Sequence, residues 1–197
     1  LHQKQNAHRN QHAADQQRLG RDHLGRGRER GLVVTFDHGP LGLGAIAAHG
    51  HADALALTVF RGADAVVLDP GTFAYHEDAG ARDRFRGTPA HGTIHFGGRS
   101  QSEMRGPFLW GAKARVRADG EGWRCDWAGG GTHRRRVAVA GGRITIEDRV
   151  DRGDAELVFP LHPAARVELQ GARARVTIGG TTALFAGEGI GPWRREP

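Results

Sequence analysis

The stretch RITIED at residues 143–148 alternates polar and apolar residues, so Ile144 and Ile146 fall on one face of an extended chain. Alternation over a short run is typical of a half-buried β-strand, whereas the apolar residues of a helix recur every three or four positions. Comparable runs lie on both sides of this stretch. They occupy residues 32–36, 54–60, 65–68, 93–96, 113–118, 134–139, 155–159, 165–169, 174–178 and 182–185.

These runs recur roughly every ten residues, and Gly or Asp turns separate most of them. Regular spacing of short strands predicts an all-β domain, either an antiparallel sandwich or a barrel. Residues 78–86 could hold a helical turn, but we predict a loop there. No internal repeat of fixed period is visible.

The composition agrees with one domain built from short strands. The chain has 197 residues, of which 31 are Gly and 8 are Pro, a content that suits many turns. Its single cysteine, Cys125, excludes an internal disulfide. The net charge of +6 predicts attraction to polyanions, namely nucleic acid, acidic polysaccharide or anionic lipid, and does not choose among them.

Residues 1–31 differ from the rest of the chain. They are rich in Gln, His, Arg, Asn and Gly, and their large aliphatic residues are Leu1, Leu19 and Leu24 alone. Because this segment can bury almost no apolar surface, we predict a disordered or weakly helical basic arm. A linker or a non-native stretch is favoured over an arm that grips a polyanion. The folded domain is then expected to span residues 32–197.

Targeting signals are not visible in the sequence. No apolar run approaches the roughly 20 residues of a membrane span, so we expect no membrane span. No signal peptide is recognised at the start, and the chain begins with Leu1 rather than Met. We therefore expect the true beginning of the protein to be missing.

The most informative polar pattern is His49-x-His51-x-Asp53, which would share one face at the head of an apolar strand. Polar groups that enter a buried strand need partners, and a metal ion, a bound anion or mutual hydrogen bonds would each serve. Asp69, before a Pro-Gly turn, and His91 are further candidates. Two histidines and a carboxylate make a reasonable zinc set. The pattern alone also fits a strand that carries these residues only for hydrogen bonding.

Five motifs that occur in a fixed order identify a family more specifically than any single motif does. They are FDHGPLG at 36–42, AHGHADAL at 48–55, LDPGTFAY at 68–75, FRGTPAHGT at 85–93 and GRSQSE at 98–103. In this order and spacing they resemble the C-terminal domain of heparinase II/III-like polysaccharide lyases. The resemblance covers residues 32–160 and does not extend to residues 1–31.

The resemblance implies a two-layer antiparallel β-sandwich of the large-sheet supersandwich type, packed against an N-terminal helical toroid domain that this chain lacks. A cleft between the two domains would hold an acidic, uronate-containing polysaccharide, which such enzymes cleave by β-elimination. The family's catalytic tyrosine lies in the helical domain, so the chain alone is expected to be inactive. A periplasmic or secreted location is implied as well.

Carried over residue by residue, the resemblance implies that His49 is catalytic, by carboxylate neutralisation or proton transfer. It implies that His51, Asp69 and His91 bind a structural zinc ion, and Asp53 is a candidate to orient these ligands.

Four other positions bear on the resemblance. His133 and Arg134 stand where the family often has His-Arg, and they are candidates to line the cleft. Gly92 stands where the family usually has Asn, which puts one polar contact near the metal in doubt. Tyr75, the only tyrosine, matches a structural aromatic residue and is not nominated as the base.

Two other function classes compete with the lyase. A non-catalytic carbohydrate-binding sandwich would keep the fold and the basic surface without requiring His49. A zinc-dependent hydrolase would need an open metal position and a general base beside it. A nucleic-acid role is the least supported, because the basic residues are scattered along strands and no nucleic-acid motif is recognised.

Overall fold

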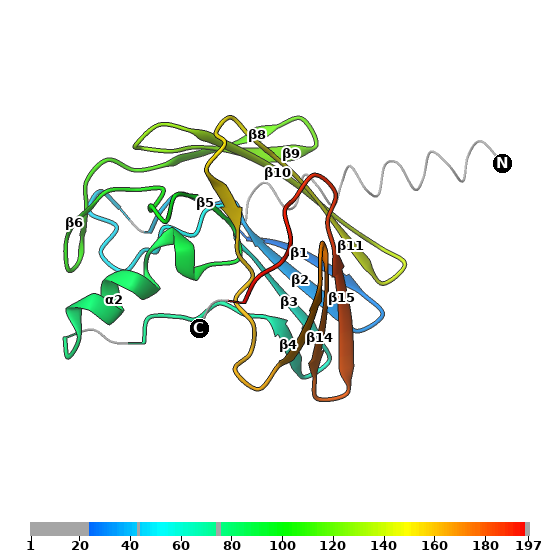
Figure 1. The fold of residues 1–197 in the computed structure, drawn as a ribbon. Coiled ribbons are helices and arrows are strands. Elements are labelled where there is room, and N and C mark those ends of the chain that lie inside the picture. The colour runs from blue at the N-terminus through cyan, green and yellow to red at the C-terminus, as the bar shows by residue number, and fades with distance from the viewer. Residues whose placement is uncertain (1–23, 43, 74–75, 196–197) are drawn as a thin grey trace.

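The structure, a computed structural model, describes residues 24–42, 44–73 and 76–195 (Figure 1). In these residues most of the regular structure is β-strand, and every strand pair is antiparallel. This confirms the all-β antiparallel prediction. No helix in this part of the chain is long and apolar enough to cross a membrane.

The strands of the described residues form two four-stranded sheets and three smaller ones. The first sheet has the order β1 (Leu24–Glu29), β2 (Leu32–Asp37), β3 (Leu57–Arg61), β4 (Asp64–Val67). The second has the order β11 (Arg143–Val150), β10 (Thr132–Ala140), β9 (Gly122–Asp126), β8 (Arg115–Asp119). The smaller sheets are β13 (Arg166–Gln170), β14 (Arg173–Ile178) and β15 (Thr181–Ala186); β12 (Ala155–Leu157) with β5 (Ile94–Phe96); and β6 (Met104–Gly106) with β7 (Leu109–Trp110).

One hydrophobic core lies between the two four-stranded sheets. In β2, buried residues alternate with half-buried ones, so Leu32, Val34 and Phe36 all point into this core. From the second sheet, Ile144 and Ile146 pack against the same core, as the alternation at residues 143–148 predicts. Burying each large aliphatic side chain contributes about 1.5–3 kcal/mol, so the shared core holds the two layers together.

The expected boundary at residue 32 is wrong, because β1 lies inside the predicted arm. This strand pairs with β2 from Leu24 opposite Asp37 to Glu29 opposite Leu32. A side chain on Gly27 would come within 3.1 Å of Val139 in β10, so this glycine lets β1 approach the second sheet closely. This strand consists mostly of glycine and charged residues, so a search for alternating apolar residues does not detect it. The rest of the predicted arm, residues 1–23, lies outside the described residues.

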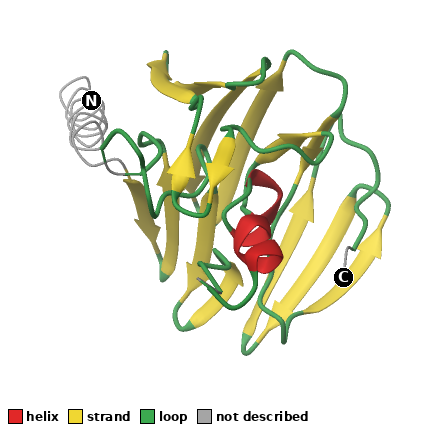
Figure 2. Cartoon of the chain, turned by 90° about the vertical axis from the view of Figure 1, so that its left-hand side faces the viewer, coloured by secondary structure: helices red, strands yellow, loops and turns green. Residues whose placement is uncertain are grey.

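A helix replaces the loop predicted at residues 78–86. Helix α2 (Ala79–Phe85) begins after Asp78, whose carboxylate accepts a hydrogen bond of 2.8 Å from the backbone N–H of Ala81. Its two turns are too short to show a 3.6-residue pattern, so only the cap could have revealed it. The helix lies at the left of Figure 1 and faces the viewer in front of the strands in Figure 2. A 3₁₀-helix, η1 (Thr88–Ala90), follows it.

Candidate metal centre and adjoining pocket

The segment that carries His49, His51 and Asp53 is a series of turns rather than the extended strand predicted for it. The backbone N–H of Gly50 donates to the carbonyl of Ala47 at 2.8 Å, and that of Ala56 donates to the carbonyl of Asp53 at 2.8 Å. Leu55 and Ala47 have positive φ values of 63° and 50°, a conformation incompatible with a strand. Regular pairing begins only at Leu57.

Side-chain donors hold this loop in place of a neighbouring strand. Each donor is a buried side chain that reaches a backbone carbonyl of the loop, so the carbonyls that a sheet would have paired are satisfied by other means. The contacts are Trp110 to Gly50 (3.1 Å), Thr88 to Ala52 (2.6 Å), Gln101 to Ala54 (2.8 Å) and Arg135 to Leu55 (2.7 Å). These hydrogen bonds hold the backbone of the loop on both sides of His51.

His51, Asp69 and His91 come together from three separate segments. One ligand atom from each lies within 4.8 Å of the others, and these are the residues of the described chain that form a group able to hold a metal ion. His91 Nδ1 lies 2.7 Å from Asp69 Oδ2, and the rings of His51 and His91 are 5.3 Å apart. We call this group the zinc cluster, after the metal that the sequence analysis expects there.

The chemistry of the zinc cluster fits a metal ion. His91 is fully buried, and within the described residues no group forms a hydrogen bond with its Nε2. Burial lowers the pKa of His51, and the nearby His91 lowers it further, so its ring is held neutral. Burial opposes ionisation of Asp69, but the hydrogen bond and charge of His91 outweigh it and lower the pKa of this carboxyl. Two imidazoles and a carboxylate are three of the ligands that a tetrahedral zinc ion takes in proteins.

His49 and Asp53 lie on different sides of His51. His49 is exposed and lines, with His51, a pocket that also contains Phe108. Asp53 lines a second small cavity on the other side, together with His51 and Gln101. Burial and then the charge of Asp37 raise the pKa of Asp53 to about 7. Both histidines thus open toward one pocket, while Asp53 is positioned behind them.

The structure separates the two candidates in β10. Arg134 is exposed on the outer face of the sheet, where its Nε donates to Asp119 at 2.5 Å, so the structure does not bring it to the pocket. His133 points inward and is fully buried, with Nε2 2.7 Å from Asp148 Oδ1. Alternation along β10 explains the difference, since adjacent residues face opposite sides of a sheet.

Arg135 is a buried residue next to the site that the sequence analysis missed. Its side chain is fully buried and forms a two-pronged ion pair with Asp148, at 2.7 Å through Nε and 2.9 Å through Nη2. Its Nη1 donates to the carbonyls of Leu55 (2.7 Å) and Gly92 (2.9 Å). Arg135 therefore connects β10 to the loop that carries His49, His51 and Asp53, which we call the histidine loop, and to Gly92, the residue after His91. Alternation could have revealed it: Val137 packs on the core, and Arg135, two residues earlier in the same strand, points to the same side of the sheet.

Gly92 is required by the packing beside His91. A Cβ at this position would come within 2.4 Å of the carbonyl oxygen of Leu57, too close for any side chain. The carbonyl of Gly92 accepts hydrogen bonds from the N–H of Leu57 at 3.1 Å and from Arg135. Gly92 therefore stands in place of the expected Asn at a point where the backbone lies too close to β3 for a side chain.

These features define a class of protein, an antiparallel β-domain in which a His–Asp cluster able to hold a metal ion lies beside a pocket lined by histidines and arginines. A family model described as "Heparinase II/III-like, C-terminal" matches residues 16–193. The chain therefore belongs to the heparinase II/III-like family, as its C-terminal domain. The match extends beyond the resemblance at residues 32–160 in both directions.

Three solved structures match part of this chain. The heparan sulfate lyase HepC from Pedobacter heparinus is 17% identical, with a TM-score of 0.48 over 78% of this chain and 22% of its own. A heparinase III is 11% identical, with a TM-score of 0.34 over 83% of this chain and 41% of its own. A second heparinase III is 10% identical, with a TM-score of 0.38 over 81% of this chain and 40% of its own. The chain thus spans less than half the length of each. No curated protein sequence matches it.

Proposed function

We propose that this chain is the β-domain of a polysaccharide lyase that cleaves an acidic, uronate-containing polysaccharide by β-elimination. Family membership supports the lyase class. The observation that carries the proposal is the position of His49, exposed in a pocket lined by histidines and arginines, on the histidine loop next to the zinc cluster. A periplasmic or secreted location is part of the proposal.

The reaction defines what this pocket has to provide. A base removes the proton from C5 of the uronate, the C4–O bond breaks, and its electrons leave with the oxygen while a C4=C5 double bond forms. The C5 proton is acidic enough only when the adjacent carboxylate is neutralised, and the leaving oxygen needs a proton. His49 is suited to neutralise the carboxylate or to transfer a proton. The base would come from a helical domain across the cleft.

Zinc in the cluster would be structural. His51, Asp69 and His91 would join the histidine loop, the Asp-Pro-Gly turn and the segment after η1, three pieces of chain that otherwise lack regular structure around the pocket. Bound there, zinc supplies charge balance and cross-linking. The chain's own side chains hold the loop on which His49 lies, since Trp110 and Thr88 donate hydrogen bonds to the carbonyls of Gly50 and Ala52.

The test is elimination by the complete enzyme that carries this domain, measured as the ultraviolet absorbance of the unsaturated uronate. Heparan sulfate, alginate and a bacterial exopolysaccharide are the substrates to compare. His49→Ala should abolish product formation without loss of zinc, and the exposed His162→Ala should leave both unchanged. Binding of a polymer without any unsaturated product would contradict the proposal and favour a non-catalytic carbohydrate-binding domain.

A further inference from the structure

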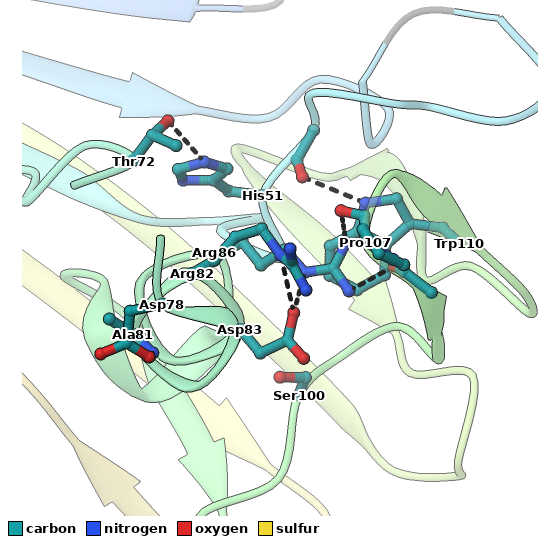
Figure 3. A network of polar contacts seen from close by, with 12 residues as sticks. His51, Thr72, Asp78, Ala81, Arg82, Asp83, Arg86, Ser100, Pro107 and Trp110 are labelled. Carbon is teal, nitrogen blue, oxygen red and sulfur yellow. Dashed lines mark hydrogen bonds and ion pairs between the residues drawn. The ribbon is translucent and has the colours of Figure 1, made fainter. Parts of the chain in front are cut away.

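Histidine and arginine side chains line the pocket beside the zinc cluster. The pocket lies between the loop that carries His49 and His51, α2 and the loop before β7, and Figure 3 shows Arg82 and Arg86 near His51 and Pro107. Its side-chain lining includes His49, His51, Thr72, Arg82, Arg86 and Phe108. Asp83 lies between the two arginines: its Oδ1 is 3.4 Å from Arg82 Nε and 3.1 Å from Arg86 Nε (Figure 3).

The two arginines have different roles. Arg86 holds the pocket wall, because its Nη1 donates to the carbonyl of Pro107 at 3.0 Å and its Nη2 to that of Gly106 at 2.7 Å. Its guanidinium group also lies over Trp110, 4.8 Å from the ring centre. Arg82, one turn earlier in α2, instead lies over the ring of Phe108, 6.0 Å from its centre.

Phe108 is the centre of a group of basic side chains. The ring of His49 lies 5.6 Å from that of Phe108, and the ring of His76 lies 6.0 Å from it. With Arg82, three basic residues from three different segments surround one half-buried aromatic ring. An aromatic ring offers an apolar surface to a sugar ring, and a guanidinium group binds carboxylate or sulfate oxygens through paired N–H donors.

We infer that Arg82 and Phe108 form a subsite for a sugar that carries an anionic group, either a carboxylate or a sulfate ester. Arg82 binds the anion, Phe108 contacts the sugar ring, and His49 lies at the edge of the same subsite. The inference rests on the proposed function and adds the residues that recognise the substrate. Because Arg82 is largely buried, its contact with an anion is less screened by water than that of a surface arginine.

The test is a calorimetric titration of this chain with a sulfated heparan tetrasaccharide and with its unsulfated counterpart. Arg82→Gln should raise the Kd about tenfold. Its matched control is Arg84→Gln, which removes the same charge from the exposed side of α2 and should change the Kd less than about twofold. A loss confined to the sulfated probe assigns the anion as sulfate, and an equal loss for both probes assigns it as carboxylate.

A second pair of variants examines the ring without changing the charge. Phe108→Ala should weaken both probes, whereas Leu109→Ala, at the exposed neighbouring position, should not. The inference is overturned if the unaltered chain binds either probe while Arg82→Gln and Arg84→Gln weaken it equally and Phe108→Ala has no effect. If the unaltered chain binds neither probe, the proposed function fails for this substrate class and the inference fails with it.

Discussion

Two His–Asp pairs in this domain have the same length and different neighbours. His91 lies 2.7 Å from Asp69, and His133 lies 2.7 Å from Asp148, with both imidazole rings fully buried. Arg135 forms an ion pair with Asp148. Among the described residues, no arginine or lysine forms an ion pair with Asp69, and its second neighbour in the zinc cluster is another histidine, His51.

The difference shows which pair is complete within the chain. Burial would raise the pKa of Asp148, but the charge of Arg135 and the bonds from His133 and Arg135 outweigh it and place this pKa well below its usual range. The carboxylate of Asp148 is thus balanced by a cation that the chain supplies. Asp69 is also held ionised, but by the hydrogen bond and charge of His91 rather than by a guanidinium group, and burial lowers the pKa of the adjacent His51. A metal ion bound by His51, Asp69 and His91 would supply the permanent positive charge that Arg135 supplies to Asp148.

The largest effect is expected from removing the chain's own cation. Arg135→Met leaves Asp148 buried without its charged partner and should lower the free energy of unfolding by about 3–5 kcal/mol, measured by urea denaturation. The control is Arg134→Met, whose ion pair with Asp119 is exposed and contributes at most about 1 kcal/mol. Equal effects of the two substitutions would remove the distinction between the buried and the exposed arginine.

Removing the external cation should have the next largest effect. With free zinc at 100 to 1,000 times its Kd, a chelator should lower the free energy of unfolding by about 2.7–4.1 kcal/mol, seen as a lower melting temperature. Asp69→Asn should melt at the same temperature with and without the chelator, and His162→Ala should respond like the unaltered chain. A chelator effect that survives Asp69→Asn would place the metal elsewhere.

The close backbone approach behind His91 can be tested separately. Gly92→Ala forces a methyl group against the carbonyl of Leu57 and should cost about 1–3 kcal/mol in the free energy of unfolding. Gly129→Ala is the matched control, because a Cβ there meets no atom within 4 Å. A neutral Gly92→Ala would mean that β3 and the segment after His91 are not packed as described.

The smallest effect is a pH dependence of stability. Burial lowers the pKa of His133, so the unfolded chain binds a proton more readily than the folded chain once the pH falls below about 6.5. Stability should therefore fall with decreasing pH in that range, by up to about 1.4 kcal/mol per pH unit for one proton. Urea denaturation of the chelated chain at pH 7.5 and at pH 5.5 measures this, and His133→Gln should reduce the slope. A slope of opposite sign would contradict a neutral, buried His133.

The sequence predicted the parts of the fold that depend on apolar alternation. The runs at residues 32–36, 134–139 and 143–148 became β2, β10 and β11, because one face of each packs on the core. It missed β1, since glycines rather than apolar side chains let that strand pack closely against the second sheet. It also missed α2, which depends on one capping carboxylate.

The candidate site shows the same division. The resemblance selected His51, Asp69 and His91, and the structure brings them together, although no spacing along the chain relates three segments joined only by long-range packing. The resemblance also selected Arg134 as a residue that lines the cleft. In the structure Arg134 is exposed on the outer face of the sheet, and the arginine that points inward is Arg135. Which arginine faces inward depends on the register of β10 with β11, where Arg135 lies directly opposite Asp148. That register is a property of the sheet and not of either strand alone.

The metal content of the purified chain tests the central claim most directly. Elemental analysis by mass spectrometry, on the unaltered chain and on Asp69→Asn and His91→Ala, compares the zinc cluster with the self-balanced pair at Asp148. We predict about one zinc per chain for the unaltered protein, and a loss of most of it in both variants. A chain that takes up no zinc, or variants that retain it fully, would contradict a metal ion as the partner of Asp69.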